Sequence, residues 1–376
     1  MSETLTLRPL RRADGPDGPS DLDAVRELRN ADMRVVHGSH DYDSSAEEIR
    51  IAWTDDEDAR QRGVIAEDGG RVLGFAAVVV PLDAGAASVS LNVRVRADAR
   101  RRGIGGLLLA AAEQIAADEG RSVLQCWTEH PPADLAREPA ISGWGSVPRD
   151  ATTMFARDQG YALEQVYRKS RFTIDAQSLA EVERLAGPAR AAAGDAYVYE
   201  WWETPTPPEN ADDIAELHAR MSTDAPSAGV EEDASDWDAA RVARWEEMSR
   251  TSGYRKIIGA ARHVASGRLV AFNELSVRGE ETTAHQNDTL VLREHRGHRL
   301  GMLVKCETLL RLHDLFPAVT RIETYNAEEN RPMLDINEEM GFAPLQYSGM
   351  WQKRVASDGS EFVSTRVGSE VVGPEA

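Results

Sequence analysis

The chain has 376 residues, of which 41% are hydrophobic and 28% are charged, and its formal net charge at pH 7 is −20. This length is enough for two ordinary domains that each bury a core, and the composition is that of a globular protein. The acidity argues against nucleic acid as a partner, because phosphate binding needs a basic field. No stretch has the length and apolar character of a membrane span or signal sequence, so we expect a cytoplasmic protein without membrane partners.

Strands and helices are predicted along the first half from hydrophobic periods near two and 3.6 residues. In chain order we expect a strand, a helix, two strands around an Asp-Gly-Gly turn, a further strand, an apolar helix and another strand, at residues 4–10, 21–33, 62–82, 87–95, 106–120 and 122–127. Residues 161–175 are predicted to complete this unit as a strand pair, and residues 129–150 form an insertion within it.

The second half repeats this order of elements, which predicts one α/β unit used twice. The matching segments are residues 197–203, 211–221, 256–277, 286–292, 301–316 and 320–326. Between the units, residues 178–194 have helical periodicity and are then interrupted by Gly187 and Pro188, which places the boundary near 176–195. Residues 222–248 form a second insertion, and residues 357–376 are a polar tail that we expect to be frayed.

A basic turn lies between a strand and an apolar helix in each half: Arg100–Gly105 reads RRRGIG and Arg296–Gly301 reads RGHRLG. The first backbone N–H groups of a helix have no partner within the helix, and together with the helix dipole they favour an anion. Glycine allows the backbone to approach phosphate oxygens, and arginine adds charge-assisted contacts. The motif therefore predicts a pyrophosphate site. The alternative is a solvated, arginine-rich helix start, and the repetition at the same place in the order of elements favours the phosphate site.

The basic turns resemble the acetyl-CoA signature of the GNAT acetyltransferase superfamily, Arg-x-x-Gly-x-Gly after a strand. Arg100–Gly105 fits this signature fully, whereas the second turn has Arg299 at the position of the first glycine. The last helix of the family ends in Gly-Phe with an asparagine eleven residues earlier, and Asn330 with Gly341-Phe342 meets this rule. In the first unit Gly160-Tyr161 matches the pair, and Arg149 replaces the asparagine.

The resemblance covers nearly the whole chain and implies two tandem GNAT-like domains, at residues 1–175 and 196–356. It implies an α/β fold in which each domain has a mixed, mostly antiparallel sheet flanked by helices. The tandem arrangement is similar to that of mycothiol synthases, although nothing in the sequence identifies that substrate.

The resemblance also implies acetyl-CoA as the cofactor and no metal. In the family, backbone groups of the fourth strand bind the pantetheine arm, and N–H groups of the turn bind the pyrophosphate. In the second unit the corresponding residues are Thr289, Leu290, Val291, Arg296, Gly297, His298, Arg299, Leu300, Gly301 and Met302, with Asn326 and Asn330 as further candidates. In the first unit they are Val93, Arg94, Val95, Arg101, Arg102, Gly103, Ile104, Gly105 and Gly106. Asn326 and Asn330 fit turn and capping roles equally well.

Candidate catalytic carboxylates occur in the second unit. An amine attacks as the neutral base, so a carboxylate or a water chain should remove a proton from it. Asp288 lies on the predicted fourth strand and Glu274 on the strand before it, whereas the aligned Asn92 of the first unit has no charge. Alternation along residues 286–292 puts Asp288 and Leu290 on the same face. A strand-edge or capping role is the alternative for Asp288.

The family usually protonates the leaving thiolate with a tyrosine four residues before the glycine of the Gly-Phe pair. Here that position is Asn337 in the second unit and Ala156 in the first. An amide cannot act as a general acid near neutral pH, though it can donate a hydrogen bond to sulfur. Either the thiolate leaves unaided, or Tyr325 or Tyr347 takes the role.

The predicted function is transfer of an acetyl group from acetyl-CoA to a primary amine of a small molecule, in the C-terminal unit of a monomer or homodimer. The alternatives are a non-catalytic acetyl-CoA-binding or regulatory protein, an enzyme that uses another acyl-CoA or a hydroxyl acceptor, and a nucleotide-binding regulator. The last lacks a Walker lysine. Trp201, Trp202 and Trp237 are candidates for lining an acceptor pocket, with a core position as the alternative.

Overall fold

The computed structural model describes residues 5–16, 18–224, 226–233 and 235–355, without the side chains of residues 222 and 223. The long strands are β1 Thr6–Pro9, β2 Ala59–Asp68, β3 Arg71–Pro81, β4 Ser88–Val95, β5 Val123–Glu129, β8 Ala162–Thr173, β9 Tyr197–Glu203, β10 Tyr254–His263, β11 Leu269–Arg278, β12 Thr283–Val291, β13 Arg321–Ala327 and β14 Ala343–Arg354. The helices are α1 Leu22–His37, α2 Ala46–Ala52, α3 Ile104–Asp118, α4 Ala151–Asp158, α5 Ala176–Ala193, α6 Ala211–Asp224, α7 Ala239–Thr251, α8 Leu300–Leu315 and α9 Arg331–Met340.

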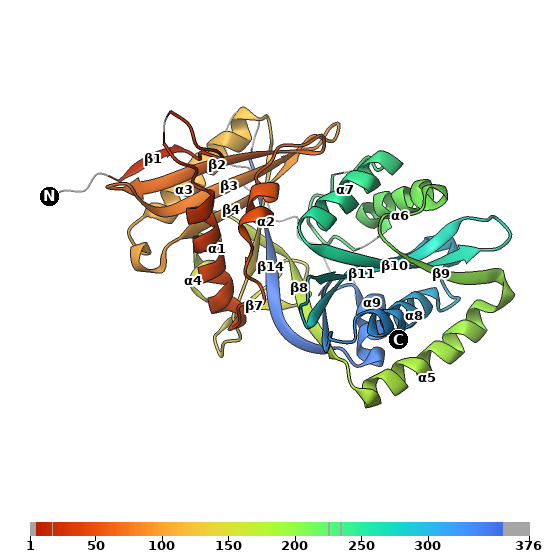
Figure 1. Ribbon diagram of the computed structural model, residues 1–376. Coiled ribbons are helices and arrows are strands. Elements are labelled where there is room, and N and C mark those ends of the chain that lie inside the picture. The colour runs from red at the N-terminus through yellow and green to blue at the C-terminus, as the bar shows by residue number, and fades with distance from the viewer. Residues whose placement is uncertain (1–4, 17, 225, 234, 356–376) are drawn as a thin grey trace, which may run out of the picture.

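The long strands form one sheet of 12 strands in the order β1-β2-β3-β4-β5-β14-β8-β13-β12-β11-β10-β9 (Figure 1). Neighbouring strands in this sheet are antiparallel, except for the parallel pairs β4–β5 and β12–β13. The predicted class, an α/β fold with a mixed and mostly antiparallel sheet flanked by helices, is confirmed. We call residues up to 175 the N-terminal half and residues from 196 the C-terminal half.

The last strand of each half lies beside strands of the other half. β14 pairs with β5 of the N-terminal half, and β8 pairs with β13 of the C-terminal half. β8 and β14 also pair with each other at the centre of the sheet, where β14 curves from one half into the other (Figure 1). The expectation of a strand pair at residues 161–175 is wrong: no turn residue interrupts the segment, so it forms one long strand. Its hydrogen-bonding partners are β13 and β14.

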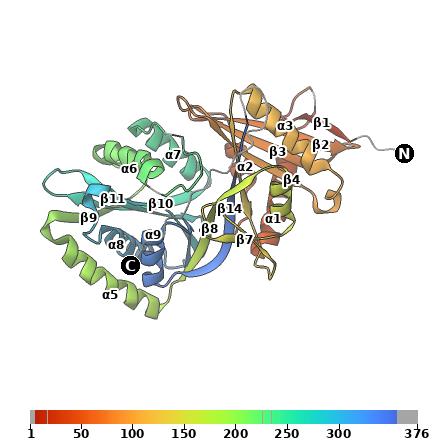
Figure 2. The same ribbon diagram turned by 180° about the vertical axis from the view of Figure 1, so that it is seen from behind.

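Helices cover both faces of the sheet in each half, as the two opposite views show (Figures 1 and 2). In the N-terminal half, α1 and α2 pack on one face around Ile65 and Phe75, and α3 packs on the other with Leu108 and Ala112 in the core. In the C-terminal half, α6 and α7 contact β10, β11 and β12, and α8 contacts the same strands. The two units therefore share their layers as well as their order of elements.

The segment between the halves is helix α5, which runs through Gly187 and Pro188 without ending. The interruption expected at these two residues does not occur, because the helix is held by packing: Val182, Leu185 and Ala189 are buried in the core of the C-terminal half. α5 covers α8, so α8 is buried on more sides than α3. The domain limits at 175 and 196 stay a prediction.

The insertion at residues 129–150 contains a short hairpin, β6 Arg137–Pro139 and β7 Ser146–Pro148, and the insertion at 222–248 contains most of α7. The polar tail expected at 357–376 lies outside the described residues. Among the helices that the structure describes, none combines the length and apolar composition of a membrane span.

Candidate active site

The parallel strands β12 and β13 diverge along their length. They pair only from Thr283–Gln286 to Arg321–Thr324, and beyond these residues a cavity of about 850 Å³ lies between them. Its walls come from β12, α8, β13 and α9, with contributions from α6, β8 and the segment that follows α6. The lining residues are Tyr167, Met221, Asp224, Pro226, Asn287, Asp288, Thr289, Leu290, Val291, Arg296, Gly297, Arg299, Leu300, Gly301, Met302, Tyr325, Asn326, Ala327, Asn330, Pro332, Met333, Ile336 and Glu339.

A β-bulge lies where the two strands separate. Gln286 is opposite Leu275 and Thr289 is opposite Asn273, so Asn287 and Asp288 together face the single residue Glu274. The bulge interrupts the regular alternation that we expected through Asp288, because two residues of one strand oppose one of its neighbour. It places Asp288 on the cavity wall, with its side chain 42% exposed.

The basic turn forms one end of the cavity. α8 begins at Leu300 after Arg299, whose φ of 55° is in the left-handed region, and no side chain caps the helix. The first N–H groups of α8 therefore have no partner inside the helix or from a cap. Gly301 lies where α8 meets α9: a Cβ there would be 3.1 Å from Cδ1 of Ile336.

Two arginines of the turn are held by carboxylates and remain about half exposed. Nη2 of Arg299 lies 3.1 Å from Oε1 of Glu339, and Nη2 of Arg296 lies 3.9 Å from Oδ2 of Asp224. The side chains of Arg296 and Arg299 are 50% and 42% exposed. His298 does not line the cavity; its ring lies 5.3 Å from that of Tyr197. The other residues predicted in this turn all line the cavity.

Asp288 has a partner that sequence reasoning missed. Nδ1 of His218 on α6 lies 3.4 Å from Oδ2 of Asp288, and the His218 ring stacks on Trp237 with centroids 4.5 Å apart. Phe272 contacts the same ring edge-on. A lone histidine on an amphipathic helix gives no signal in the sequence, because only the fold brings it to β12. Trp237 thus supports His218.

Glu274 and Asn337 do not line the cavity. Glu274 is buried, and its Oε1 accepts hydrogen bonds from Nδ2 of Asn287 at 2.7 Å and Nζ of Lys256 at 2.9 Å. Asn337 is buried and donates through Nδ2 to Oδ1 of Asn326 at 2.6 Å. Both therefore support residues of the wall. Asn326 and Asn330 line the cavity, and Asn330 precedes α9 without capping it.

Of the two candidate tyrosines, Tyr325 lines the cavity and Tyr347 does not. The hydroxyl of Tyr325 donates to Oε1 of Glu129 at 3.1 Å. Burial and the neighbouring Glu129 carboxylate raise the pKa of Tyr325 above its ordinary value. Trp201 and Trp202 belong to the core of the C-terminal half and are not on the cavity wall.

Comparisons with known proteins address the family and the fold. Residues 22–137 match the model of the acetyltransferase (GNAT) family. A tandem GNAT protein from the clavulanic acid biosynthesis pathway, solved without AcCoA, superposes with a TM-score of 0.68 at 24% identity, covering 93% of this chain and 98% of its own. Residues 22–137 therefore match a GNAT-family domain, and the chain as a whole has the fold of a tandem GNAT protein. The predicted arrangement of two GNAT-like units is confirmed.

Two further solved GNAT structures share the fold. A GCN5-related glucosamine N-acetyltransferase region of a fungal multi-domain GH3 β-N-acetylglucosaminidase has a TM-score of 0.59 at 15% identity, covering 94% of this chain and 38% of its own. A GCN5-related N-acetyltransferase from Sphaerobacter thermophilus has a TM-score of 0.54 at 16% identity, covering 93% of this chain and 95% of its own. No curated protein matches the sequence. The family model matches the half with the complete Arg-x-x-Gly-x-Gly motif, whereas the large cavity lies in the other half.

The basic turn of the N-terminal GNAT-like unit has the same backbone setting. α3 begins at Ile104 after Gly103, whose φ is 82°, and the parallel strands β4 and β5 pair only from Ser88–Leu91 to Val123–Cys126. The predicted residues Val93, Arg94, Val95, Arg101, Arg102, Gly105 and Gly106 lie on β4 beyond this pairing or in the turn and first turn of α3. No register shift occurs between β3 and β4.

Side chains of the N-terminal unit occupy this region differently. Arg94 and Arg100 both contact the carboxylate of Asp32 on α1, at 3.2 and 2.6 Å. A Cβ on Gly105 would lie 3.4 Å from the ring of Phe155. Arg94 and Arg100 are thus bound to a helix of their own half.

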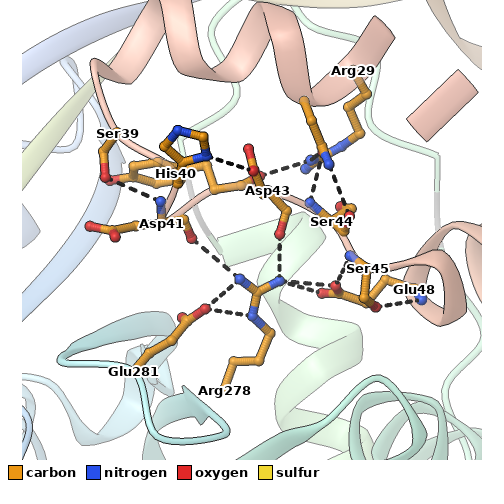
Figure 3. A network of polar contacts seen from close by, with 12 residues as sticks. Arg29, Ser39, His40, Asp41, Asp43, Ser44, Ser45, Glu48, Arg278 and Glu281 are labelled. Carbon is orange, nitrogen blue, oxygen red and sulfur yellow. Dashed lines mark hydrogen bonds and ion pairs between the residues drawn. The ribbon is translucent and has the colours of Figure 1, made fainter. Parts of the chain in front are cut away.

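The loop between α1 and α2 is bound to the C-terminal half through Arg278 (Figure 3). Nη1 of Arg278 donates to Glu48 at 2.9 Å and to the carbonyl oxygen of Asp43 at 2.9 Å, and Arg321 contacts Asp41 at 2.7 Å. Glu281 contacts Arg278 from the other side. These contacts tie the loop to strands β11 and β13.

Proposed function

We propose that this protein is an acyl-CoA-dependent N-acetyltransferase that moves an acetyl group from acetyl-CoA to a primary amine of a small molecule, in the C-terminal half. The observation that carries the proposal is the cavity between β12 and β13, with the basic turn at one end and Asp288 on its wall. Nucleic acid and membranes are not part of the proposal.

The residues present fit acetyl-CoA. Between Asp288 and the basic turn the wall consists mainly of apolar side chains from β12, α8 and α9, as the pantetheine arm requires. The free N–H groups at the start of α8, with Arg296 and Arg299, suit the pyrophosphate. Asp288 and Val291 are separated by roughly 10 Å of strand at about 3.3 Å per residue, so the cavity joins a phosphate end to a reacting end.

Acetyl-CoA, when bound, supplies a thioester whose acyl carbon is the electrophile. Asp288 then takes a proton from the ammonium group of the acceptor, because only the neutral amine is a nucleophile. His218 holds the carboxylate of Asp288 from the side of α6. Glu274, bonded to Lys256, fixes Asn287 and with it the bulge that presents Asp288.

Calorimetry with acetyl-CoA, followed by mass spectrometry of a panel of primary amines, tests the proposal. We expect saturable binding and addition of an acetyl group to at least one amine. The alternative of a non-catalytic acetyl-CoA-binding protein predicts binding without acetylated product. Absence of both binding and product with millimolar acetyl-CoA contradicts the proposal, and product with another acyl-CoA alone identifies the donor as different.

A further inference from the structure

Two side chains of the N-terminal half contribute to the cavity of the C-terminal half, one on its wall and one as the partner of a wall residue. Tyr167 on β8 lines it, and Glu129 on β5 accepts the hydrogen bond of Tyr325. In the sheet, β14 and β8 lie between β5 and β13, and the row Glu129, Ser348, Tyr167, Ala327 runs across these four strands. The exchange of β8 and β14 therefore brings Glu129 to the edge of the cavity.

Glu129 is held from the N-terminal half as well. Nε2 of His37, at the end of α1, lies 3.5 Å from Oε2 of Glu129, and Nδ1 of His37 lies 3.1 Å from Oε1 of Gln346. The side chains of His37 and Glu129 are 3% and 17% exposed. Burial alone would raise the pKa of Glu129, but contacts with His37, Lys169 and Tyr325 hold it below its ordinary value. Before the reaction Glu129 is therefore an ionised carboxylate, held in place, that accepts the hydrogen bond of Tyr325.

This pairing determines which way the hydroxyl of Tyr325 acts. Its proton is directed at Glu129, so the lone pairs of its oxygen are left for a donor in the cavity. A phenol in this arrangement accepts a proton more readily than it gives one to a thiolate. The geometry therefore argues against Tyr325 as the general acid that the sequence left open.

Conversion of a primary ammonium group into an amide removes two protons from nitrogen, and Asp288 accounts for the first. We propose that Tyr325 accepts the second, and that Glu129 and His37 of the N-terminal half are the positioning residues that make this possible; the inference rests on the proposed function. As nitrogen bonds to the acyl carbon and the bond from that carbon to sulfur breaks, the proton moves from nitrogen to Oη of Tyr325. The proton of Tyr325 moves to Glu129, which returns it to solvent, and the sulfur is protonated from solvent.

The chain contains a matched control for this pair. The hydroxyl of Tyr161 donates to Oε1 of Glu113 at 3.0 Å, in the N-terminal half and away from the cavity wall. With acetyl-CoA and an accepted amine, we expect Tyr325→Phe and Glu129→Gln to lower kcat by about 10²-fold, the lower end of general-base effects. The double variant should be no slower than Tyr325→Phe. KM for acetyl-CoA should stay within about twofold, Glu129→Asp should recover part of the rate, and Glu113→Gln should keep it.

A measurement without turnover uses protein labelled with ¹³C at Cζ of tyrosine. The NMR signal absent in Tyr325→Phe identifies Tyr325, and it should shift in Glu129→Gln and stay in place in Glu113→Gln. An unshifted Tyr325 signal in Glu129→Gln overturns the pairing. A wild type that binds acetyl-CoA and acetylates an amine, with kcat unchanged in Tyr325→Phe, overturns this role alone. A wild type that does neither overturns the proposed function and this role with it.

Discussion

The two halves place the same elements around the same divergence of two parallel strands, but different side chains stand there. Ser88 pairs with Val123 in one half and Thr283 with Arg321 in the other, so Tyr325 corresponds to Trp127. Registers with the neighbouring strands match Glu274 to Ala77. Of the strand pairs β3–β4 and β11–β12, only β11–β12 contains a bulge. Asp288 therefore has no counterpart of its own in the N-terminal half.

Under the proposed function, the two halves have different tasks. The N-terminal half has the complete glycine motif, yet its β3–β4 pair has no bulge with a carboxylate, and the strand facing β4 has no phenol at the position of Tyr325. It contributes instead to the other half, through β8 and through Glu129 and His37. Duplication followed by exchange of the last strands thus fits one reaction site that uses residues from both copies.

Among variants that test the difference between the halves, Asp288→Asn is expected to change activity most. It removes the charge from the bulge, so that the bulge carries no carboxylate, like the corresponding part of β4. Loss of a general base should lower kcat/KM for the amine by about 10²–10⁴-fold. Binding of acetyl-CoA, measured by calorimetry, should be nearly unchanged. His218→Gln is the matched variant, because it leaves the carboxylate of Asp288 in place. It should lower kcat/KM for the amine by about tenfold. Full activity of Asp288→Asn would make Asp288 a structural residue.

A second effect concerns the helices that follow the two basic turns. Lys305 is the sixth residue of α8, and Leu109 is the sixth residue of α3. Nζ of Lys305 is buried without a hydrogen-bond partner among the described residues, and burial lowers the pKa of Lys305 from 10.5 to about 7. A shift of this size corresponds to at most roughly 5 kcal/mol of unfolding free energy.

Lys305→Leu should therefore stabilise the protein, and the gain should depend on pH. The folded state loses its proton near pH 7, whereas the unfolded state keeps it up to about pH 10.5, so the cost of the buried charge is present below pH 7 and fades as pH rises through this window. Urea unfolding at pH 6.5 and 9.5 measures this. Leu109→Met, a swap of similar volume in the other helix, is the control. An equal or negative change for Lys305→Leu at both pH values contradicts the account.

The smallest effect is expected from Arg278→Gln, which releases the loop between α1 and α2 of the N-terminal half. Loss of charge-assisted hydrogen bonds to Glu48 and to the carbonyl oxygen of Asp43 should cost about 2 kcal/mol of unfolding free energy. Because the loop does not line the cavity, acetyl-CoA binding should stay within about twofold. Arg255→Gln, which removes a more exposed ion pair with Glu203, provides the comparison. A fall in binding with unchanged stability would show that the loop serves the site.

Most elements, both basic turns and the strand that carries Asp288 could be predicted because they depend on local patterns. The strand, turn and apolar helix around Arg296–Gly301 lie within a short segment, and the repeat supplies a second copy of the pattern. The exchange of β8 and β14 could not be predicted, since a strand with two possible neighbours has the same alternation in either place. The partners His218, Glu129 and His37 follow from that exchange and from the packing of α6 and α1.

The bulge shows the same limit on a smaller scale. One extra residue between Gln286 and Thr289 is invisible in the alternation of β12 alone and appears only when its register with β11 is known. Asn337 was expected near the reacting end because it takes the place of the tyrosine of the family. Its side chain is instead buried against Asn326. Strand register and packing determine the bulge in β12 and the position of Asn337, and both depend on residues distant in sequence.

The claim that the C-terminal half binds the cofactor and carries turnover is tested most directly by calorimetry and turnover of Gly301→Glu and Gly105→Glu with acetyl-CoA. Gly301→Ala controls for packing, since its Cβ has one close contact, 3.1 Å from the end of the flexible Ile336 side chain, and Val291 Cγ2 at 3.7 Å is at an ordinary distance. We expect Gly301→Glu to abolish binding and acetylation, whereas Gly105→Glu should keep at least about a tenth of the activity, a barrier change of no more than about 1.4 kcal/mol. Loss of both in Gly105→Glu, with both retained in Gly301→Glu, would contradict it.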